Sequence, residues 1–575
     1  MKLNSLKIAN FRSFGPGAPI EPLIEIPDDR CSKISFNENV IYLLGKNNSG
    51  KSSILHAYEK LYKQKSTLNL EDFHNKDTNN TVVIEAELLA DNQDELDVQN
   101  DNVGKWFSPE TKLARVRKRW EGIGAYKKET FDPSISEWTE GGFGGWDSIL
   151  QNRLPEPIWV RAIMEPQEIV EVLQKLIKEA VLKNIQTMAE YVAVTEAITA
   201  LSTAIDGDDY TRSVVDQLNL IVGQVFPGTQ FDISSLYPEK NVSSLFDKQA
   251  TISVTQEGSP NLPLAQQGHG LQRQFILSAL RGLYSQFAEL KKTKNKNLAI
   301  GEENFDKSKI ILFEEPELFL HPNAVKLTSD LIYELSSNSP LQILATTHSP
   351  NLVNLSKNHQ NIVRVMRYES GSKARQIGSQ LFNDNDRDAF KLAYSLNRKI
   401  TEFLFADEVI LVEGHTEEVV IQCILERLKA EQGISPQREI YILNATSKNE
   451  IKRYQKIMNH FHQDYHVVHD SDADQAHNSA GEETPIWQEN NIIWDLITKA
   501  RENESCAGRY VMSPEFEPAH GYEPKGLGKP YDAFKAAKGW NLDDANKPII
   551  EFLRHICGEI CDKQFTPDEL QQELS

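Results

Sequence analysis

The spacing of apolar residues predicts an α/β protein. Short, continuous apolar runs bounded by glycine, proline or polar residues predict buried strands. These runs lie at 40–44, 309–313, 341–346, 408–412, 440–443, 465–469 and 509–512. Alternating apolar and polar positions predict further strands at 6–14, 34–36, 82–88 and 250–257. Apolar residues at helical spacing fill 166–225 instead, and helices are also expected over 274–290 and 388–405.

Length and charge limit the class of protein. A chain of 575 residues is expected to hold more than one core. The net charge of −21 argues against a generally basic, nucleic-acid-coating protein, but a local basic groove stays open. No apolar run approaches the roughly 20 residues that span a bilayer. The five cysteines are scattered, and the charged, alternating N-terminus does not have the pattern of a signal peptide, so we expect a cytoplasmic protein with no membrane association.

A glycine loop follows the apolar run at 40–44. The loop has the complete G-x-x-x-x-G-K-S spacing and precedes a helical pattern, which predicts a site for ATP and Mg²⁺. Backbone N–H groups would surround the phosphates, Lys51 would reach the β- and γ-phosphates, and the Ser52 hydroxyl would bind Mg²⁺. The expected nucleotide-binding residues here are Gly45, Asn47, Asn48, Ser49, Gly50, Lys51, Ser52 and Ser53.

Two carboxylates end the strand predicted at 309–313. Because strand ends in α/β sheets carry ligands, Glu314 is expected to support Mg²⁺ and Glu315 to orient the attacking water. The usual residue on the metal side is aspartate, so Glu314 is a longer substitute. The next buried strand ends in Thr346, Thr347 and His348.

These motifs resemble the ABC-type heads of the RecF/SMC/Rad50 ATPases. The opening I-A-N-F-R-S-F implies that Arg12 approaches the phosphates, and His348 resembles the switch histidine that senses the γ-phosphate. Gly268 and Gly270 lie where such heads carry a signature loop that contacts the nucleotide of the other subunit, although the glycine order differs. The resemblance implies a homodimer at least. The resemblance does not place a Q-loop. Asp72 to His74 lie in the loop before the strand predicted at 82–88, but they are not assigned to it.

Acidic residues end two strands of the last third of the chain. Glu413 and Glu417 are four apart where a strand gives way to a helix, so both can face one site. Asp470 and Asp472 form a D-x-D after another strand, and alternate residues there point the same way. Together these carboxylates predict an oxygen-rich site for Mg²⁺, with Mn²⁺ as the alternative.

This order of motifs resembles the Toprim domain, and the whole chain resembles the OLD (overcoming lysogenisation defect) family of ATPase–Toprim nucleases, which includes the Gabija nuclease subunit and some retron effectors. The resemblance adds Glu517 as a further acidic residue and Lys529 as a phosphate-stabilising lysine, with Lys535 and Lys538 as competitors. The catalytic residues expected are Glu413, Glu417, Asp470, Asp472, Glu517 and Lys529 for cleavage, and Glu315 for ATP hydrolysis. The metal ligands expected are Ser52 and Glu314 in the head, and Glu413, Glu417, Asp470 and Asp472 in the Toprim domain.

The predicted organisation is an ABC-type head at 1–165 and 226–395, a helical insertion at 166–225, and a Toprim domain at 405–575. The insertion is either a dimer interface or a core helix pair. We expect a metal-dependent DNA endonuclease controlled by ATP, acting in antiphage defence with a helicase or a retron reverse transcriptase and its DNA as partner. The alternative is a RecF/SMC-like DNA-binding ATPase whose Toprim domain docks without cutting. Whether ATP activates or restrains cleavage stays open.

Overall fold

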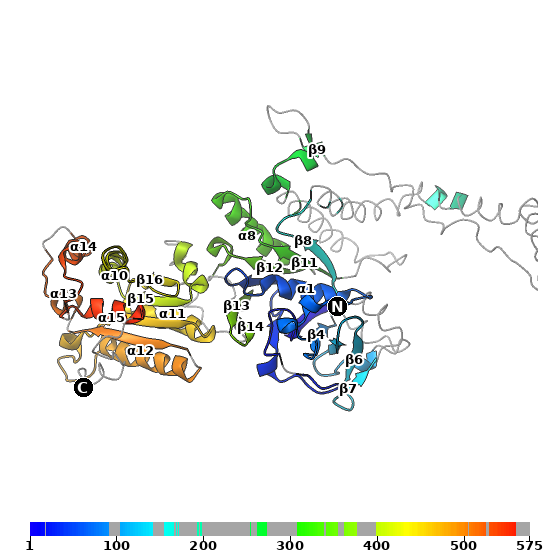
Figure 1. The fold of residues 1–575 in the computed structure, drawn as a ribbon, viewed down its shortest axis with the longest axis horizontal. Coiled ribbons are helices and arrows are strands. Elements are labelled where there is room, and N and C mark those ends of the chain that lie inside the picture. Colours follow the sequence, from blue (N-terminus) through cyan, green and yellow to red (C-terminus); the bar gives the residue numbers. More distant parts are fainter. Residues whose placement is uncertain are drawn as a thin grey trace, which may run out of the picture. The chain divides into compact units, whose positions relative to one another are not determined.

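A computed structural model describes most of residues 1–90, 104–165, 308–376 and 398–558, with isolated stretches between 168 and 276 (Figure 1). The chain divides into two compact units. One unit comprises Met1–Ala162 and Ile300–Ser575, and the other comprises Ile163–Ala299. Most of the predicted insertion and the helix predicted at 274–290 lie outside the described residues, so the predicted domain boundaries stay predictions.

An antiparallel sheet of six strands begins the first unit. Its order is β2-β1-β4-β5-β6-β7. The bounds are β1 (Lys2–Ala9), β2 (Ser32–Ser35), β4 (Val82–Leu89), β5 (Leu113–Trp120), β6 (Lys127–Asp132) and β7 (Glu137–Glu140). The strand predicted at 6–14 was wrong at its C-terminal end: β1 stops at Ala9 because Asn10 and Arg12 adopt positive φ angles of 56° and 53°, which turn the chain out of the ladder.

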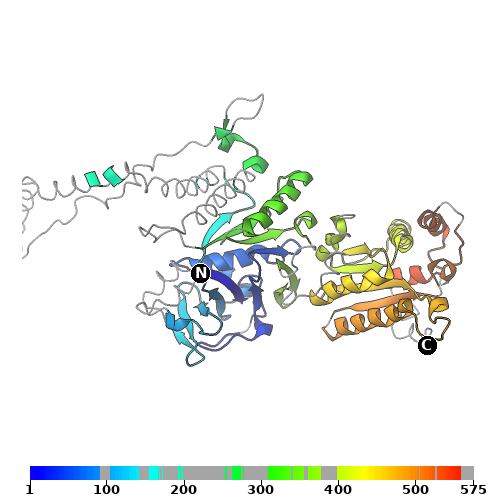
Figure 2. The ribbon, with the colours of Figure 1, turned by 180° about the vertical axis from the view of Figure 1, so that it is seen from behind.

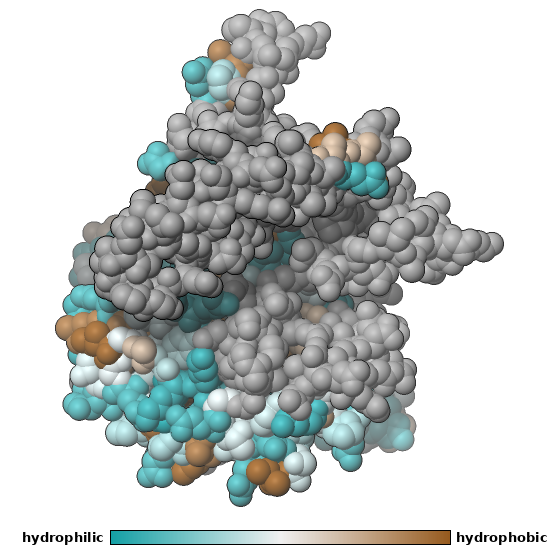
Figure 3. Space-filling model, turned by 90° about the vertical axis from the view of Figure 1, so that its right-hand side faces the viewer, coloured by the Kyte–Doolittle hydropathy of each residue, from teal (hydrophilic) through white to brown (hydrophobic). Residues whose placement is uncertain are grey.

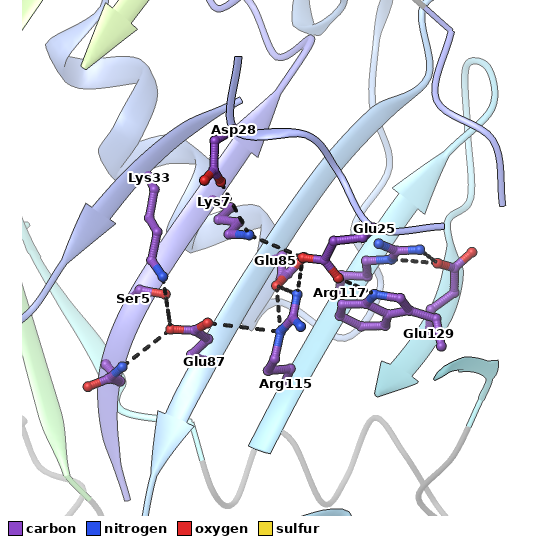
Figure 4. A network of polar contacts seen from close by, with 12 residues as sticks. Ser5, Lys7, Glu25, Asp28, Lys33, Glu85, Glu87, Arg115, Arg117 and Glu129 are labelled. Atoms are coloured by element: carbon purple, nitrogen blue, oxygen red, sulfur yellow. Dashed lines mark hydrogen bonds and ion pairs between the residues drawn. The ribbon is translucent and has the colours of Figure 1, made fainter. Parts of the chain in front are cut away.

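A network of charged side chains, some buried and some exposed, crosses one face of this sheet (Figure 4). The Arg115 guanidinium lies 2.7 Å from Glu85 and 2.5 Å from Glu25. Glu129 accepts hydrogen bonds from Arg117 and Arg119 at 2.5 and 2.7 Å. Burying a carboxylate costs free energy unless a cation or a hydrogen-bond donor is placed beside it. The arginines therefore stabilise the buried Glu85 and Glu129 in this sheet.

The central sheet carries the glycine loop. Its order is β14-β13-β3-β12-β11-β8, and every neighbouring pair is parallel except β13 with β14. The bounds are β3 (Val40–Leu44), β8 (Glu156–Val160), β11 (Lys309–Glu314), β12 (Gln342–Thr347), β13 (Ile362–Tyr368) and β14 (Gly371–Gln376), with helices α1 (Lys51–Tyr62) and α8 (Pro322–Ser337). Both faces of β3 are buried, which explains its uninterrupted apolar sequence.

A separate four-stranded parallel sheet forms the C-terminal part of the same unit, seen from behind in Figure 2. Its order is β16-β15-β17-β18. The strands are β15 (Glu408–Val412), β16 (Ile440–Asn444), β17 (Asp464–Asp470) and β18 (Ala507–Met512). The helices are α10 (His415–Arg427), α11 (Lys448–His460), α12 (Pro485–Glu502), α13 (Phe516–Ala519), α14 (Lys529–Gly539) and α15 (Pro548–Ile556). All four strands lie within a residue or two of their predicted positions, which places Glu413 and Asp470 at the carboxyl edge.

Short elements complete the described chain. The 3-10 helices are η1 (Asp28–Arg30), η2 (Leu70–Asp72), η3 (His74–Lys76), η4 (Gly104–Trp106), η6 (Leu264–Gln266), η7 (Pro350–Leu352), η9 (Arg398–Phe405) and η11 (Ala473–Gln475); η10 (Leu428–Gln432) is a π-helix. Of the strand predicted at 250–257, only β9 (Ser253–Val254) is described, paired with β10 (Leu262–Pro263). The helix predicted at 388–405 is described only from Arg398, and there it is a 3-10 helix.

The described surface is mainly hydrophilic on the face shown in Figure 3, where hydrophobic side chains form small separate groups. Such scattered apolar residues are normal for a protein surface and need no partner to explain them. Among the described helices, none combines the length and the apolar content required to cross a membrane.

Candidate functional site

The glycine loop between β3 and α1 has the geometry that its spacing predicts. Gly45 and Gly50 have φ angles of 149° and 108°. A Cβ at Gly45 would lie 2.2 Å from the Val365 carbonyl oxygen, and one at Gly50 would lie 2.4 Å from Ser13 Oγ. Only glycine fits both positions, because each combines a positive φ with a close neighbour.

Lys51 is the first residue of α1 and is buried. Its Nζ donates to the carbonyl oxygens of Gly45 and Lys46, both at 2.8 Å. Burial lowers the pKa of Lys51 to about 8, while the charges of Glu315 and Glu317 oppose that shift. A buried cation at the positive end of a helix is a strong anion site, so the loop suits a phosphate chain.

The other predicted loop residues differ in exposure. Asn47, Asn48 and Ser52 are exposed, so their polar groups are accessible. Ser49 is buried and its Oγ has no hydrogen-bond partner. Ser53 is half-buried. The exposed Ser52 hydroxyl next to Lys51 is compatible with its predicted role as a Mg²⁺ ligand.

Arg12 lies in the turn that ends β1, one residue before Ser13, whose Oγ abuts Gly50. Its guanidinium donates to Asp72 Oδ1 at 3.0 Å, and Lys60 approaches the other oxygen of the same carboxylate at 3.2 Å. The His74 ring contacts the Arg12 carbonyl oxygen at 3.0 Å. The loop that contains Asp72 and His74 therefore packs on Arg12, a relation that sequence spacing could not supply.

The carboxylates at the end of β11 lie beside the segment that follows β12, which contains His348. Glu315 has a φ of 43°, and its N–H donates to the Thr346 carbonyl oxygen at 3.0 Å. His348 Nε2 lies 3.5 Å from Glu315 Oε1. Burial, together with the nearby Lys51 charge, lowers the pKa of His348. Glu314 Oε2 accepts the Ala162 N–H at 3.2 Å. Lys51, Glu315 and His348 thus share one electrostatic environment.

Glu317 is a residue of this site that sequence reasoning missed. Its Oε1 accepts the N–H groups of His348 and Ser349 at 2.7 and 3.1 Å, and the Thr347 hydroxyl at 2.8 Å. The carboxylate therefore fixes the backbone that presents the histidine. The available signal was the second glutamate of the Glu315-Pro316-Glu317 run, to which no role had been assigned.

Gly268 and Gly270 lie in the second unit. A helical turn starts beside them, and the N–H groups of Leu271 and Gln272 donate to the Gly268 carbonyl oxygen at 3.0 and 3.2 Å. This geometry is compatible with a glycine loop at a helix start. Its predicted role across a dimer stays a prediction.

The acidic residues predicted for the Toprim site converge at the carboxyl edge of the four-stranded parallel sheet. β15 and β17 are parallel neighbours, so Glu413 and Asp470 follow adjacent strand ends. The Asp470 N–H lies 3.4 Å from Glu413 Oε2. Glu417 is buried in the first turn of α10, where its Oε2 accepts the Gly414 N–H at 3.0 Å. Its carboxylate is therefore held facing the strand end.

Burial, with the neighbouring acids, raises the pKa values of Asp470 and Glu413. Burial raises the pKa of Asp470 to about 8, and the negative charges of Glu417, Glu413, Asp472 and Glu517 add to that shift. Burial raises the pKa of Glu413 to about 7, although Lys448 opposes it. The buried Asp470 Oδ1 has no hydrogen-bond partner. A carboxylate cluster of this kind is stabilised by a cation, which fits a divalent metal of the Mg²⁺ type.

The described residues do not form a closed coordination shell. No group of three or more His, Cys, Asp or Glu side chains in the described ranges is arranged to hold a metal ion. The donor chemistry fits a metal, while the ligand assignment stays a prediction.

Glu517 and Lys529 form the outer side of this cluster. Glu517 is buried in α13, and Lys529 Nζ lies 3.4 Å from its Oε1. The Glu517 charge raises the pKa of Lys529. The two competing lysines lie against aromatic rings: Lys535 over Tyr531 at 5.4 Å and Lys538 over Phe534 at 4.5 Å.

A P-loop in a mixed sheet, followed by a parallel sheet with an acidic carboxyl edge, defines an ATPase head joined to a Toprim domain. The family model for an AAA ATPase domain matches residues 1–118 and 114–353, and the Overcoming lysogenization defect protein-like TOPRIM domain matches residues 404–472. The chain belongs to this ATPase family, in the OLD arrangement with a C-terminal Toprim domain. The predicted fold class and family resemblance are confirmed.

Three named relatives align with half of this chain or more. The Old nuclease of Escherichia phage P2 is 24% identical over 491 residues, covering 80% of this chain and 75% of that protein. The OLD nuclease of Thermus scotoductus is 26% identical over 318 residues, covering 52% and 54%. Endonuclease GajA of Bacillus cereus strain VD045 is 24% identical over 458 residues, covering 76% and 69%. A solved Smc head bound to the C-winged helix domain of ScpA is 15% identical over 66% of this chain and 98% of that chain, with a TM-score of 0.35, too low to support conclusions about the fold.

Proposed function

We propose that this protein is a metal-dependent DNA endonuclease whose activity is controlled by ATP. The observation that carries the proposal is the meeting of Glu413, Glu417 and Asp470 at one sheet edge, with the pKa values of all three raised. Three similar proteins are named as nucleases, which supports a phosphodiester substrate. Bound Mg²⁺ or Mn²⁺ would activate the attacking water and neutralise the charge on the phosphate.

Each side chain has a distinct task in this proposal. Glu413, Asp470 and Asp472 would hold one metal ion, and Glu417 and Glu517 would complete a second position. Lys529 is exposed at the rim, and its ammonium would stabilise the charge that develops on the phosphate. The carboxylates repel the DNA backbone until cations neutralise them, so metal binding precedes substrate binding.

In the head, the loop from Gly45 to Ser53 would bind ATP with Mg²⁺ on Ser52 and Glu314. Glu315 would orient the attacking water, and His348 would sense the γ-phosphate through its position 3.5 Å from Glu315. Gly268 and Gly270 would contact nucleotide on a second head, so we propose a homodimer or higher homo-oligomer. Cytoplasmic antiphage defence, with a helicase or a reverse transcriptase–DNA complex as partner, follows from the family resemblance.

The test uses purified protein with supercoiled and linear DNA, Mg²⁺ or Mn²⁺, and nucleotide present or absent. Glu413→Ala and Asp470→Ala are expected to abolish cleavage while ATP binding is retained. Glu431→Gln, a change at an exposed residue that pairs with Arg427 on the same helical stretch, is the matched control and should cut normally. Undiminished cleavage by the two alanine variants would refute the site.

One observation favours the alternative function, a DNA-binding ATPase with a docking Toprim domain. The described acidic residues do not form a ready-made metal shell. If wild-type protein binds DNA but leaves it intact at every metal and nucleotide condition, this alternative is correct and the endonuclease proposal fails.

A further inference from the structure

Lys448 is a buried cation in an unfavourable place. It is the first residue of α11, and only 3% of its side chain is exposed. The N-terminal end of a helix carries positive partial charge, so a cation there is disfavoured. Burial of the ammonium adds a desolvation cost. Strong partners must therefore compensate for the position of Lys448.

Those partners are the two aspartates of the D-x-D segment. Lys448 Nζ donates to the Asp470 carbonyl oxygen at 2.8 Å and pairs with Asp472 Oδ2 at 2.5 Å. Asp472 has φ and ψ angles of 54° and 35°, a left-handed conformation that is uncommon for a residue other than glycine. One ammonium thus fixes the backbone of the first aspartate and the carboxylate of the second.

Lys448 differs from the other lysine of the site. Lys529 has a side chain that is 65% exposed and lies 3.4 Å from Glu517, so it can reach a substrate. Lys448 is enclosed, and its ammonium contacts the Asp470 carbonyl oxygen and the Asp472 carboxylate. Its place predicts a role in orienting ligands, without contact to DNA.

We propose that Lys448 is a positioning residue that holds Asp472 for metal binding. The ammonium occupies Oδ2 of Asp472 and leaves Oδ1 for a cation, since a carboxylate has acceptor sites on both oxygens. Loss of the ammonium frees Asp472 to leave its left-handed conformation. This inference rests on the proposed nuclease site and adds a residue to which the sequence motifs assign no role.

The test is a double-mutant cycle on Mn²⁺ binding, measured by calorimetry on the full chain without DNA or nucleotide. Lys448→Met is expected to weaken Mn²⁺ binding by at least about tenfold, the usual effect of removing a residue that orients metal ligands. In an Asp472→Asn background the same change should alter binding by less than about twofold, because its effect runs through Asp472.

The matched control is Lys452→Met. Lys452 lies one turn further along α11 and pairs with Glu489 at 2.5 Å. The substitution therefore removes a similar ion pair outside the site. It should leave Mn²⁺ binding unchanged. Lys448→Gln, which keeps a hydrogen-bond donor without charge, replaces the methionine variant in the cycle if that variant does not fold.

Wild-type-like Mn²⁺ binding by the Lys448 variant would overturn the inference. An equal loss in both backgrounds would also overturn it, because it would show a structural effect independent of Asp472. The nuclease proposal is tested separately. If the variants show the predicted coupling in Mn²⁺ binding but the wild type never cuts DNA, the nuclease proposal fails and Lys448 remains a positioning residue of a metal site.

Discussion

Glu317 Oε1 accepts the backbone N–H of His348 at 2.7 Å. The same oxygen accepts the Ser349 N–H, so one carboxylate holds the segment that presents the histidine beside Glu315. Small displacements of groups around a reacting phosphate are costly, which makes this clamp a target for mutation.

Glu317→Ala is therefore expected to lower the rate of ATP hydrolysis by about 10- to 100-fold. Nucleotide affinity should change by less than about threefold, because the phosphate contacts of the glycine loop remain intact. Phosphate release and binding of a fluorescent nucleotide measure the two effects. Asp330→Asn on the exposed side of α8 is the control. A variant that loses binding and hydrolysis equally would contradict the positioning role.

Asp470→Asn is expected to stabilise the metal-free protein at alkaline pH. The folded pKa of Asp470 is about 8, above the unfolded value of about 3.9, so the wild type loses stability as pH rises from about 4 to 8. Asparagine does not titrate. The melting temperature in EDTA should match wild type near pH 4 and exceed it at pH 8.

The control for this experiment is Asp495→Asn on the exposed side of α12. Added Mn²⁺ should raise the melting temperature of the wild type and of the control, and much less that of Asp470→Asn. A stability difference between Asp470→Asn and wild type that stays constant from pH 4 to 8 would contradict the raised pKa.

Lys529→Ala is expected to lower DNA cleavage by about 100-fold with Mn²⁺ binding retained, because the ammonium stabilises charge on the phosphate and does not bind metal. Lys535→Ala should cut like the wild type, since Lys535 lies over the Tyr531 ring. Plasmid nicking rates give the comparison. An equal loss in both variants would leave Lys529 without its special role.

Glu25→Gln is expected to weaken the N-terminal sheet at neutral pH. Burial alone would raise the pKa of Glu25, but hydrogen bonds from Arg115 and Trp138 outweigh it and lower the pKa to about 2. A depressed pKa contributes stability that is complete above about pH 4.3 and is lost as pH falls toward 2. The effect is modest because half of the Glu25 side chain is exposed.

The measurement for Glu25→Gln is the urea midpoint at pH 7 and at pH 2.5. The midpoint should fall at pH 7, and the difference from wild type should shrink at pH 2.5. Asp28→Asn is the control. Asp28 is 91% exposed and its carboxylate comes no nearer to Lys7 than 3.9 Å, so its ion pair is weak. A pH-independent difference would show that packing, and not charge, explains the change.

Local sequence determined the strands that carry the candidate sites and the motifs that follow those strands. The apolar runs at 40–44, 309–313 and 408–412 form β3, β11 and β15. Strands of a parallel sheet are buried on both faces, so short continuous apolar runs between turn residues predict them. The glycine loop could likewise be recognised, since its spacing and its two positive-φ glycines are local requirements.

Local sequence was less informative where the backbone makes an unusual turn. The alternating pattern at 6–14 continues past Ala9, but positive φ angles at Asn10 and Arg12 end β1 there. That conformation depends on contacts with residues about 60 positions away, among them the hydrogen bond from Arg12 to Asp72. Alternation alone does not contain this information.

By itself, the sequence determined the strands on which the candidate sites lie and the chemical type of each site, because strand-forming runs and glycine spacing are properties of short segments. Only the tertiary structure decided which side chains support those sites. Glu317, which follows β11, reaches His348 at the end of the neighbouring β12, and Lys448 of α11 reaches Asp472 in the turn after β17. The physical reason is that a buried charge must find its partner in space, and residues far apart in the chain can provide it.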